Sequence, residues 1–190
     1  SPVPHAKIVS IDTSRALAQP GVHLVLVGQD MPTTFGILPV SQDEHALCLD
    51  KVRFVGDPVA AVIASTELIA EEALALIDVT YEPLSTIASP EEALATAEPR
   101  IHDYGDQGNV HKSVALSFGS VEQGFAEADH VFEDTFHYSG NTHLPLETHA
   151  SVAALDPDGK LTIWSSTQTP HYAHRAIAKV LGLPPSRVRV

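Results

Sequence analysis

The sequence has only one cysteine, Cys48, among its 190 residues. It therefore holds no internal disulfide, no cysteine-ligated cluster and no cysteine-based zinc site, which fits a reducing compartment, and we expect a cytoplasmic protein. Its apolar runs are far shorter than the roughly 18 residues of a membrane span, and the polar start SPVPHAK lacks a signal-peptide core. We therefore expect no contact with a membrane.

Basic residues are also scarce. The chain carries 11 lysines and arginines against 24 acidic residues, a formal net charge of -13, and it has no basic cluster that would neutralise a run of phosphates. Nucleic acid is thus excluded as an expected partner. Hydrophobic residues make up 44% of the chain, enough for one core or two small ones. The sequence starts without Met and ends in the strand-like SRVRV, so we expect both ends to be cuts through a longer protein.

The first half of the chain alternates short apolar runs with helical segments. AKIVSID, VHLVLVG, PVAAVIAS and LIDVTYE are typical of strands, and Thr66 can cap a helix between the last two. This alternation predicts an α/β or α+β unit over residues 1–85. A capping box, Ser89 with Glu92, then opens a short helix, and the polar stretch that follows completes a connecting segment over residues 86–119.

Residues 120–190 form a second pattern. Ser120 and Gln123 make another capping box, and the alternating residues 130–140 predict a long strand. HASVAAL and KLTIWSS predict two further strands that flank the turn sequence DPDG. Thr169 is expected to cap a helix with Pro170 at its first position, and a strand should begin at the final RVRV.

Two groups of histidines are candidate metal ligands. His143, Glu147 and His149 would share one face of a strand, but Pro145 interrupts it and the spacing matches no compact zinc motif. Hydrogen bonding at a domain or cofactor boundary is the alternative interpretation. His171 and His174 lie one helical turn apart, where partly solvated polar residues are the commoner explanation. We expect no metal site built from these residues.

The segment WSSTQTP places a glutamine between a strand end and a helix start. In extended geometry Trp164, Ser166 and Gln168 share a face. An amide donates and accepts hydrogen bonds without carrying charge, so Gln168 suits a site that orients an oxo or hydroxyl oxygen. A structural role in the cap region is the alternative.

Six segments in register resemble the molybdenum-binding large subunit of the xanthine dehydrogenase and aldehyde oxidase family. They are SPVPHAKIVSIDTSRALAQPGVHLVLVG, KVRFVGDPVAAVIAS, ALIDVTYEPL, GSVEQGFAEADHVFE, HLPLETHASVAAL and IWSSTQTPHYAHRAIAKVLGLPPSRVRV. Within the family, TFGILPVSQDEHALCLDKVRFVGDPVAAV is most similar to the α-subunit of 4-hydroxybenzoyl-CoA reductases.

The resemblance implies an α+β fold in which an α/β hammerhead domain over residues 1–85, without its first strand, precedes the start of a molybdopterin-binding domain over residues 120–190. It assigns Gln168 to the molybdenum cofactor and gives Glu147 and Thr167 supporting roles, with the metal held by the pterin dithiolene. The glycine-rich cofactor loop and the catalytic glutamate of the family are expected beyond Val190. The parent protein would thus be an enzyme, whereas residues 1–190 alone would be inactive and bind no cofactor.

The implied reaction is reductive removal of an aryl hydroxyl from an aryl-CoA, or hydroxylation of a small aromatic substrate, with iron-sulfur clusters and FAD on partner subunits or domains. Two other classes stay open. The chain is a structural module that docks onto other subunits, or a metal-dependent hydrolase built on His143, Glu147 and His149.

Overall fold

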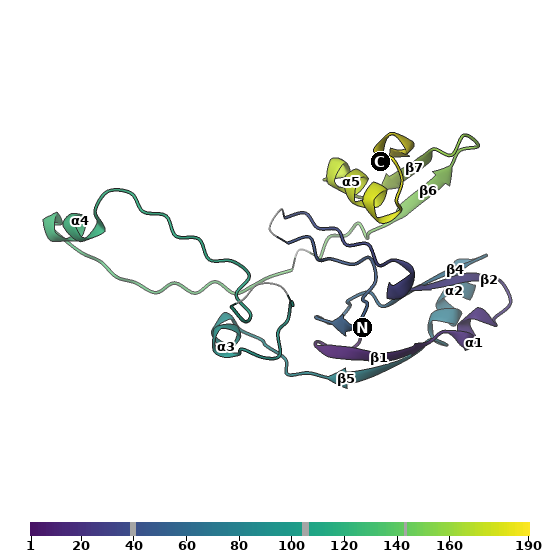
Figure 1. The fold of residues 1–190 in the computed structure, drawn as a ribbon, viewed down its shortest axis with the longest axis horizontal. Helices are drawn as coiled ribbons and strands as arrows, with labels where there is room; N and C mark the ends of the chain where they lie inside the picture. Colours follow the sequence, from purple (N-terminus) through teal and green to yellow (C-terminus); the bar gives the residue numbers. More distant parts are fainter. Residues whose placement is uncertain (39–40, 104–106, 143) are drawn as a thin grey trace.

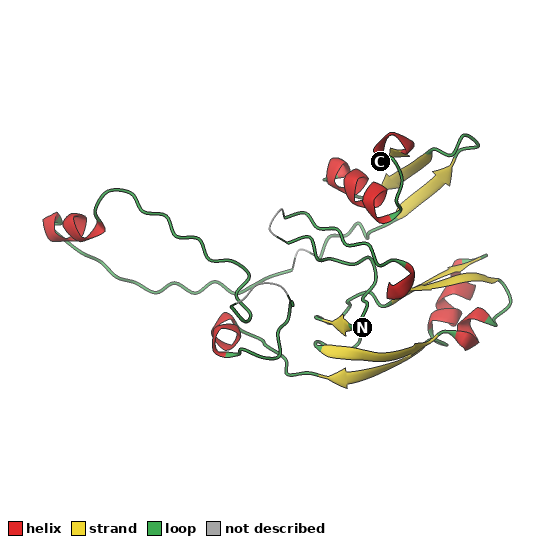
Figure 2. Ribbon diagram, viewed as in Figure 1, coloured by secondary structure: helices red, strands yellow, loops and turns green. Residues whose placement is uncertain are grey.

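The computed structural model describes residues 1–38, 41–103, 107–142 and 144–190 (Figure 1). Helices and strands are mixed in an N-terminal unit and in a smaller C-terminal unit, and a long stretch of extended chain lies between them (Figure 2). Within the described residues no helix is long and apolar enough to cross a membrane.

The N-terminal unit contains two antiparallel sheets. One has the strand order β3-β1-β5 and the other pairs β2 with β4. The first strand is the centre of the larger sheet, so its backbone pairs with a strand on each side. The strands are β1 (Ala6–Asp12), β2 (Val22–Val27), β3 (Lys51–Val52), β4 (Ala60–Ala64) and β5 (Asp78–Pro83). Four of these strands coincide with the apolar runs of the sequence, whereas β3 is a two-residue strand that the sequence does not mark.

Two helices pack against the smaller sheet. They are α1 (Ser14–Leu17) and α2 (Glu67–Leu74). Ala16 and Ala73 are fully buried against Val25, and these small side chains let both helices approach the sheet closely. The hydroxyl of Thr66 accepts a hydrogen bond from the amide of Ile69 at 3.3 Å, so the predicted cap of α2 is confirmed.

A second core cluster lies under the larger sheet and includes the single thiol. Ala6, Cys48, Val52 and Val59 are all buried there. Burial, followed by a hydrogen bond to Asp57, raises the pKa of Cys48 to about 12, so its thiol stays protonated at neutral pH. Cys48 is therefore a packing residue and not a reactive one.

The backbone beside Cys48 requires a glycine. Gly28 begins the short 3-10 helix η1 (Gly28–Asp30), and a Cβ atom at this position would lie 2.2 Å from the carbonyl oxygen of Cys48. No rotamer change can relieve that contact because both partners are main chain. The segment after β2 and the segment before β3 thus meet at a distance that only glycine permits.

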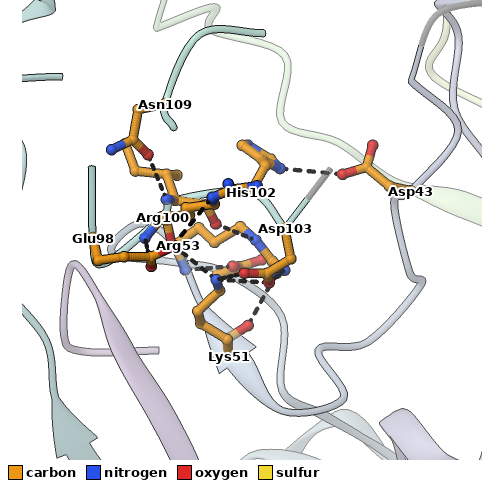
Figure 3. A network of polar contacts seen from close by, with 10 residues as sticks. Asp43, Lys51, Arg53, Glu98, Arg100, His102, Asp103 and Asn109 are labelled. Carbon is orange, nitrogen blue, oxygen red and sulfur yellow. Dashed lines mark hydrogen bonds and ion pairs between the residues drawn. The ribbon is translucent and has the colours of Figure 1, made fainter. Parts of the chain in front are cut away.

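Two cations of the N-terminal unit hold the connecting segment that follows α3 (Pro90–Ala95) (Figure 3). The ammonium of Lys51, whose side chain is only 9% exposed, donates to the carbonyl oxygen of Arg100 and to the carboxylate of Asp103, both at 2.9 Å. Arg53 donates to the carbonyl oxygen of Ile101 at 2.9 Å. The stretch interpreted as a linker is thus fastened to β3.

A side-chain amide extends this network on the other side. Asn109 accepts a hydrogen bond from the amide of Ile101 and donates one to the carbonyl oxygen of Thr96, both at 2.8 Å. Asn109 therefore joins Ile101, whose carbonyl oxygen Arg53 contacts, to Thr96 at the end of α3; Figure 3 shows Asn109 beside this network.

The carboxylate of Asp103 is held in its charged form. Partial burial raises the pKa of Asp103, but the hydrogen bond and charge of Lys51, together with the charge of Arg53, outweigh this and keep the pKa below its usual value. A lowered carboxyl pKa stabilises the fold above the unfolded pKa of about 4, and this contribution is lost as the pH falls through the folded value.

An extended arm projects from the two units and carries α4 (Val121–Glu127) at its tip (Figure 1). We define the arm as residues 110–142 and 144–149. The hydroxyl of Ser120 accepts from the amide of Gln123, so the second predicted cap is confirmed. Large apolar side chains along the arm are exposed: Phe118 by 84%, Phe132 by 87%, Phe136 by 90% and Tyr138 by 90%.

The strand predicted over residues 130–140 is wrong. The chain is extended there, but it pairs with no other described strand. A strand requires backbone hydrogen bonds to a neighbouring strand. Alternation of apolar residues indicates only that one face of the extended chain is apolar, and it does not identify a partner strand.

The C-terminal unit is a three-stranded sheet, order β6-β7-β8, with one helix on it. β6 and β7 are antiparallel and joined by the predicted DPDG turn, in which the amide of Gly159 donates to the carbonyl oxygen of Asp156 at 2.8 Å. β8 runs parallel to β7 after the crossover helix α5. The elements are β6 (Ser151–Leu155), β7 (Leu161–Ser165), α5 (Pro170–Val180), η2 (Pro185–Arg187) and β8 (Val188–Arg189).

The contact at Gly28 gives a first prediction. Gly28→Ala forces the main chain at Cys48 to move and should lower the free energy of unfolding by about 1–3 kcal/mol, measured by urea denaturation. The matched control is Gly124→Ala in α4, where an added Cβ meets no atom within 4 Å. That variant should be neutral or stabilised by up to about 1 kcal/mol, because alanine favours a helix interior. Equal effects of the two substitutions would contradict the proposed close approach.

The Lys51 network gives a second prediction. Asp103→Asn should lower the free energy of unfolding at pH 7 by about 1 kcal/mol, a value kept small because the Asp103 side chain is 61% exposed. The difference from the unchanged protein should shrink as the pH falls below about 4, the unfolded pKa, and vanish once the pH is below the lowered pKa of the folded carboxyl. Glu82→Gln is the control, since the Lys7–Glu82 pair is 57% exposed on both sides and should be worth less than about 0.5 kcal/mol. A pH-independent difference would show that charge is not the cause.

Candidate functional site

The carboxyl end of β7 is tied to the start of β6 by hydroxyl groups. The hydroxyl of Ser151 donates to that of Ser165 at 3.1 Å. Ser166, one residue past the strand, accepts from the amide of Ala150 at 3.0 Å, and its own amide donates to the carbonyl oxygen of Ala150 at 3.1 Å. The small polar residues thus extend the hairpin by one residue and fix where the chain leaves it.

The turn into α5 is organised by Thr167. Its hydroxyl accepts a hydrogen bond from the amide of Thr169 at 3.1 Å. Thr169 occupies the N-cap position with Pro170 next to it, as expected, but its side chain makes no capping hydrogen bond to the helix. The prediction that Thr169 caps α5 through its side chain is therefore wrong, because its hydroxyl lies near that of Thr167 instead, at 3.3 Å. Thr167 thus has a local structural role, because its hydroxyl holds the amide of Thr169 at the start of α5.

Gln168 lies between these two threonines and is exposed. Its side-chain amide forms no hydrogen bond with another described residue. It sits next to the first turn of an 11-residue helix, where backbone N–H groups are left without partners in the helix. The position thus presents an uncharged donor and acceptor to an external group.

Glu147 leaves the same end of the hairpin. Because Ser151 pairs with Ser165, the residues before β6 and the residues after β7 emerge together. Glu147 is exposed at the end of the arm, and no contact joins it to Gln168 in the described chain. The structure therefore brings the two candidates to one edge of the sheet without bringing them into contact.

The candidate metal ligands are not assembled. His143 lies outside the described residues, and His149 is exposed. In the described ranges no three His, Cys, Asp or Glu residues are placed to hold a metal ion. His174 lies with Nε2 at 2.9 Å from the carbonyl oxygen of Pro185 and 3.1 Å from that of Val188, so this ring fastens α5 to β8.

A cleft of about 600 Å³ lies between residues 35–37 with Gln42 on one side and α5 on the other. The N-terminal unit contributes Phe35, Ile37 and Gln42, and α5 contributes Tyr172, Arg175 and Lys179. Thr169, the residue after Gln168, lines the end of the cleft at the start of the helix. The cleft therefore ends at the residue that follows Gln168, while Gln168 itself is not among its lining residues.

The sequence analysis did not single out the helix residues of this cleft. Arg175 lies over the ring of Tyr172, with its guanidinium carbon 4.6 Å from the ring centre. The three-residue spacing of Tyr172 and Arg175 on a predicted helix could have indicated that these two side chains meet. The facing segment lies about 130 residues earlier in the chain, and no local pattern predicts that encounter.

Comparison with known protein families covers both units. Residues 1–85 match the family described as "Aldehyde oxidase and xanthine dehydrogenase, a/b hammerhead domain". Residues 101–190 match the "Molybdopterin cofactor-binding domain". The expected α+β fold, a hammerhead domain followed by the start of a molybdopterin-binding domain, is thereby confirmed.

Two curated relatives align with the whole chain. The "Nicotinate dehydrogenase large molybdopterin subunit" of Eubacterium barkeri is 43% identical over 192 residues, which are 100% of this chain and 44% of the relative. The "Xanthine dehydrogenase molybdenum-binding subunit" of Escherichia coli O157:H7 is 34% identical over 204 residues, 100% of this chain and 26% of the relative. The chain thus spans less than half the length of these relatives.

A solved structure shows the same arrangement. Quinoline 2-oxidoreductase from Pseudomonas putida 86 superposes with a TM-score of 0.81 at 33% identity, covering 99% of this chain and 25% of that one. Both units and their order are shared. The chain therefore belongs to the xanthine dehydrogenase and aldehyde oxidase family of molybdopterin-dependent oxidoreductases.

Proposed function

We propose that the full-length protein is a molybdenum-dependent oxidoreductase in which Gln168 contacts the molybdenum centre. The observation that carries this proposal is the exposed amide of Gln168, without a described hydrogen-bond partner, between the end of β7 and the start of α5. Family membership supports the reaction class, and the local geometry supports this part for Gln168.

The residues around Gln168 fit such a centre. Ser165, Thr167 and Gln168 are exposed, uncharged and able to donate or accept hydrogen bonds. Molybdopterin, when bound, would supply the metal and its oxidation-reduction chemistry, so this chain need not offer a cluster of metal ligands. Its own task is to donate a hydrogen bond from the Gln168 amide to an oxygen and to hold that amide in place.

Preorganisation of the amide comes from its neighbours. Ser166 is bound to Ala150 by three hydrogen bonds, and the hydroxyl of Thr167 accepts one from the amide of Thr169. The residues before and after Gln168 are thus fixed, which reduces the cost of orienting its side chain at the moment of reaction. For Glu147, which is exposed at the same edge of the sheet, we propose a supporting role.

For the reaction, we propose hydroxylation of an activated carbon in a planar aromatic heterocycle. The relatives and the neighbour in structure support this, since nicotinate dehydrogenase and quinoline 2-oxidoreductase are named after such compounds. The cleft beside Gln168 has aromatic and aliphatic walls from Phe35, Ile37 and Tyr172, which suit a flat ring.

A second candidate is a reductase similar to 4-hydroxybenzoyl-CoA reductase, acting on an aryl-CoA. It is favoured by the spacing of residues 34–62, the segment that includes Phe35 and Ile37 of the cleft. Consumption of 4-hydroxybenzoyl-CoA in the presence of a reductant, without hydroxylation of any heterocycle, would select this candidate.

We propose that partner subunits or domains carry the iron-sulfur clusters and FAD that accept or deliver electrons. The curated relatives support this, because their names describe subunits of larger enzymes. Within the chain we propose a hammerhead domain at 1–85, a connecting segment at 86–119 and the start of the molybdopterin-binding domain at 120–190.

Substitution of Gln168 tests the proposal. In the full-length enzyme with its partners, Gln168→Ala should lower kcat by about 10-fold to 100-fold, because a preorganised donor is lost at the reacting oxygen. Molybdenum content by mass spectrometry and the melting temperature should be unchanged. Gln29→Ala is the matched control, since among the described residues its side-chain amide donates only to the carbonyl oxygen of Leu49, at 3.4 Å.

Two results would contradict the proposal in different ways. Unchanged kcat in Gln168→Ala would remove Gln168 from the site. A full-length enzyme that contains neither molybdenum nor pterin would overturn the reaction class itself.

A further inference from the structure

The cleft that residues 35–37 and Gln42 form with α5 differs in charge from the rest of the chain. Acidic residues outnumber basic ones by 24 to 11. None of the described residues that line this cleft is acidic, whereas two of them, Arg175 and Lys179, are basic. A cationic cleft on a strongly acidic chain attracts anions locally and repels them elsewhere.

The two cations are placed differently. Arg175 folds back over Tyr172, one turn toward the start of α5 and hence toward Gln168. Lys179 lies one turn farther along and donates to the side-chain oxygen of Gln42 at 3.5 Å, across the cleft. Arg175 is thus the cation that faces the Gln168 end, and Lys179 is engaged with the opposite wall.

The walls between these charges are apolar and aromatic. Phe35 and Ile37 lie on one side, and the ring of Tyr172 lies on the other under the guanidinium of Arg175. A guanidinium stacked on a ring keeps its edge N–H groups free for a carboxylate, which it can bind with two hydrogen bonds.

The spacing sets the size of a ligand. Arg175 is five residues beyond the first residue of α5, which is about 7.5 Å along the helix axis at 1.5 Å per residue. Because the side chain of Arg175 reaches back over Tyr172, the guanidinium lies closer than this to the start of α5, so the length along the axis admits about one aromatic ring at most.

We propose that this cleft binds a planar aromatic carboxylate, with its carboxylate on Arg175 and its ring between Tyr172 and Ile37, and that Arg175 thereby selects anionic substrates. The inference rests on the proposed function, because it places the reacting carbon of that ligand near Gln168. Arg175 is a binding residue here and takes no part in the chemistry.

A phosphate of the cofactor is the competing anion. Phosphates are typically bound by several backbone N–H groups at glycine-rich turns or helix starts. The cleft at Arg175 offers instead an aromatic face and aliphatic side chains in the second turn of α5. These walls favour a ring that bears a carboxylate.

Equilibrium binding to the full-length enzyme tests the proposal without requiring turnover. Benzoate and benzamide have the same ring and differ in charge, so calorimetry should show benzoate bound about 10-fold or more tightly. Arg175→Gln should abolish this preference, and Arg175→Lys should retain part of it. Arg15→Gln makes the same change of net charge on α1, outside the cleft, and should leave the preference intact.

Three results would overturn the inference. They are absence of a benzoate preference, a preference that survives Arg175→Gln, and loss of molybdenum or pterin from the Arg175→Gln enzyme. The third would show that the guanidinium holds the cofactor. Failure of the proposed function is distinguishable, because it appears as normal turnover in Gln168→Ala while the Arg175-dependent preference for benzoate remains.

Discussion

The buried ammonium of Lys51 is the contact on which the arrangement of the chain depends. It lies in a two-residue strand at the edge of the larger sheet, and its charge requires partners because it has almost no access to water. Those partners, the carbonyl oxygen of Arg100 and the carboxylate of Asp103, come from the segment after α3. A charge in the first domain thus fixes the path by which the chain enters the second, and it does so through main-chain atoms as well as side chains.

The carboxyl end of β7 in the C-terminal unit is stabilised by hydroxyl groups and not by charge. Hydroxyl groups of Ser165, Ser166 and Thr167 take over the hydrogen bonds of the strand after its apolar pattern has ended. The small polar residues at the end of β7 therefore have a structural role. They continue the pairing of the hairpin past its apolar residues, and Gln168 is the first residue whose side chain takes no part in it.

Elements with local causes were predictable from the sequence. The caps at Thr66, Ser89 and Ser120 are formed by the expected hydroxyls, and the DPDG turn joins the expected strands. Each depends on residues within four positions of one another. The sequence also identified Gln168 as a candidate, since an amide at the junction of a strand and a helix is a local feature.

Long-range contacts were not predictable. The strand expected over residues 130–140 has apolar alternation but no described neighbour, and alternation does not specify a partner. The hydroxyl of Thr169 lies near that of Thr167 and makes no capping bond to α5, and propensity does not decide between these two arrangements. The encounter of Phe35 with Tyr172 and Arg175 depends on how the two domains dock, which is a property of the whole chain.

The arm has a consequence for the behaviour of residues 1–190 in solution. Its exposed aromatic side chains, Phe118, Phe132, Phe136 and Tyr138, adjoin extended backbone whose N–H and C=O groups have no ladder in the described chain. Such a segment is a template for intermolecular pairing and for chaperone binding. The net charge of -13 opposes that association by repulsion between copies, and salt screens the repulsion. Colloidal stability of this polypeptide is therefore set by ionic strength more than by the strength of its folded cores.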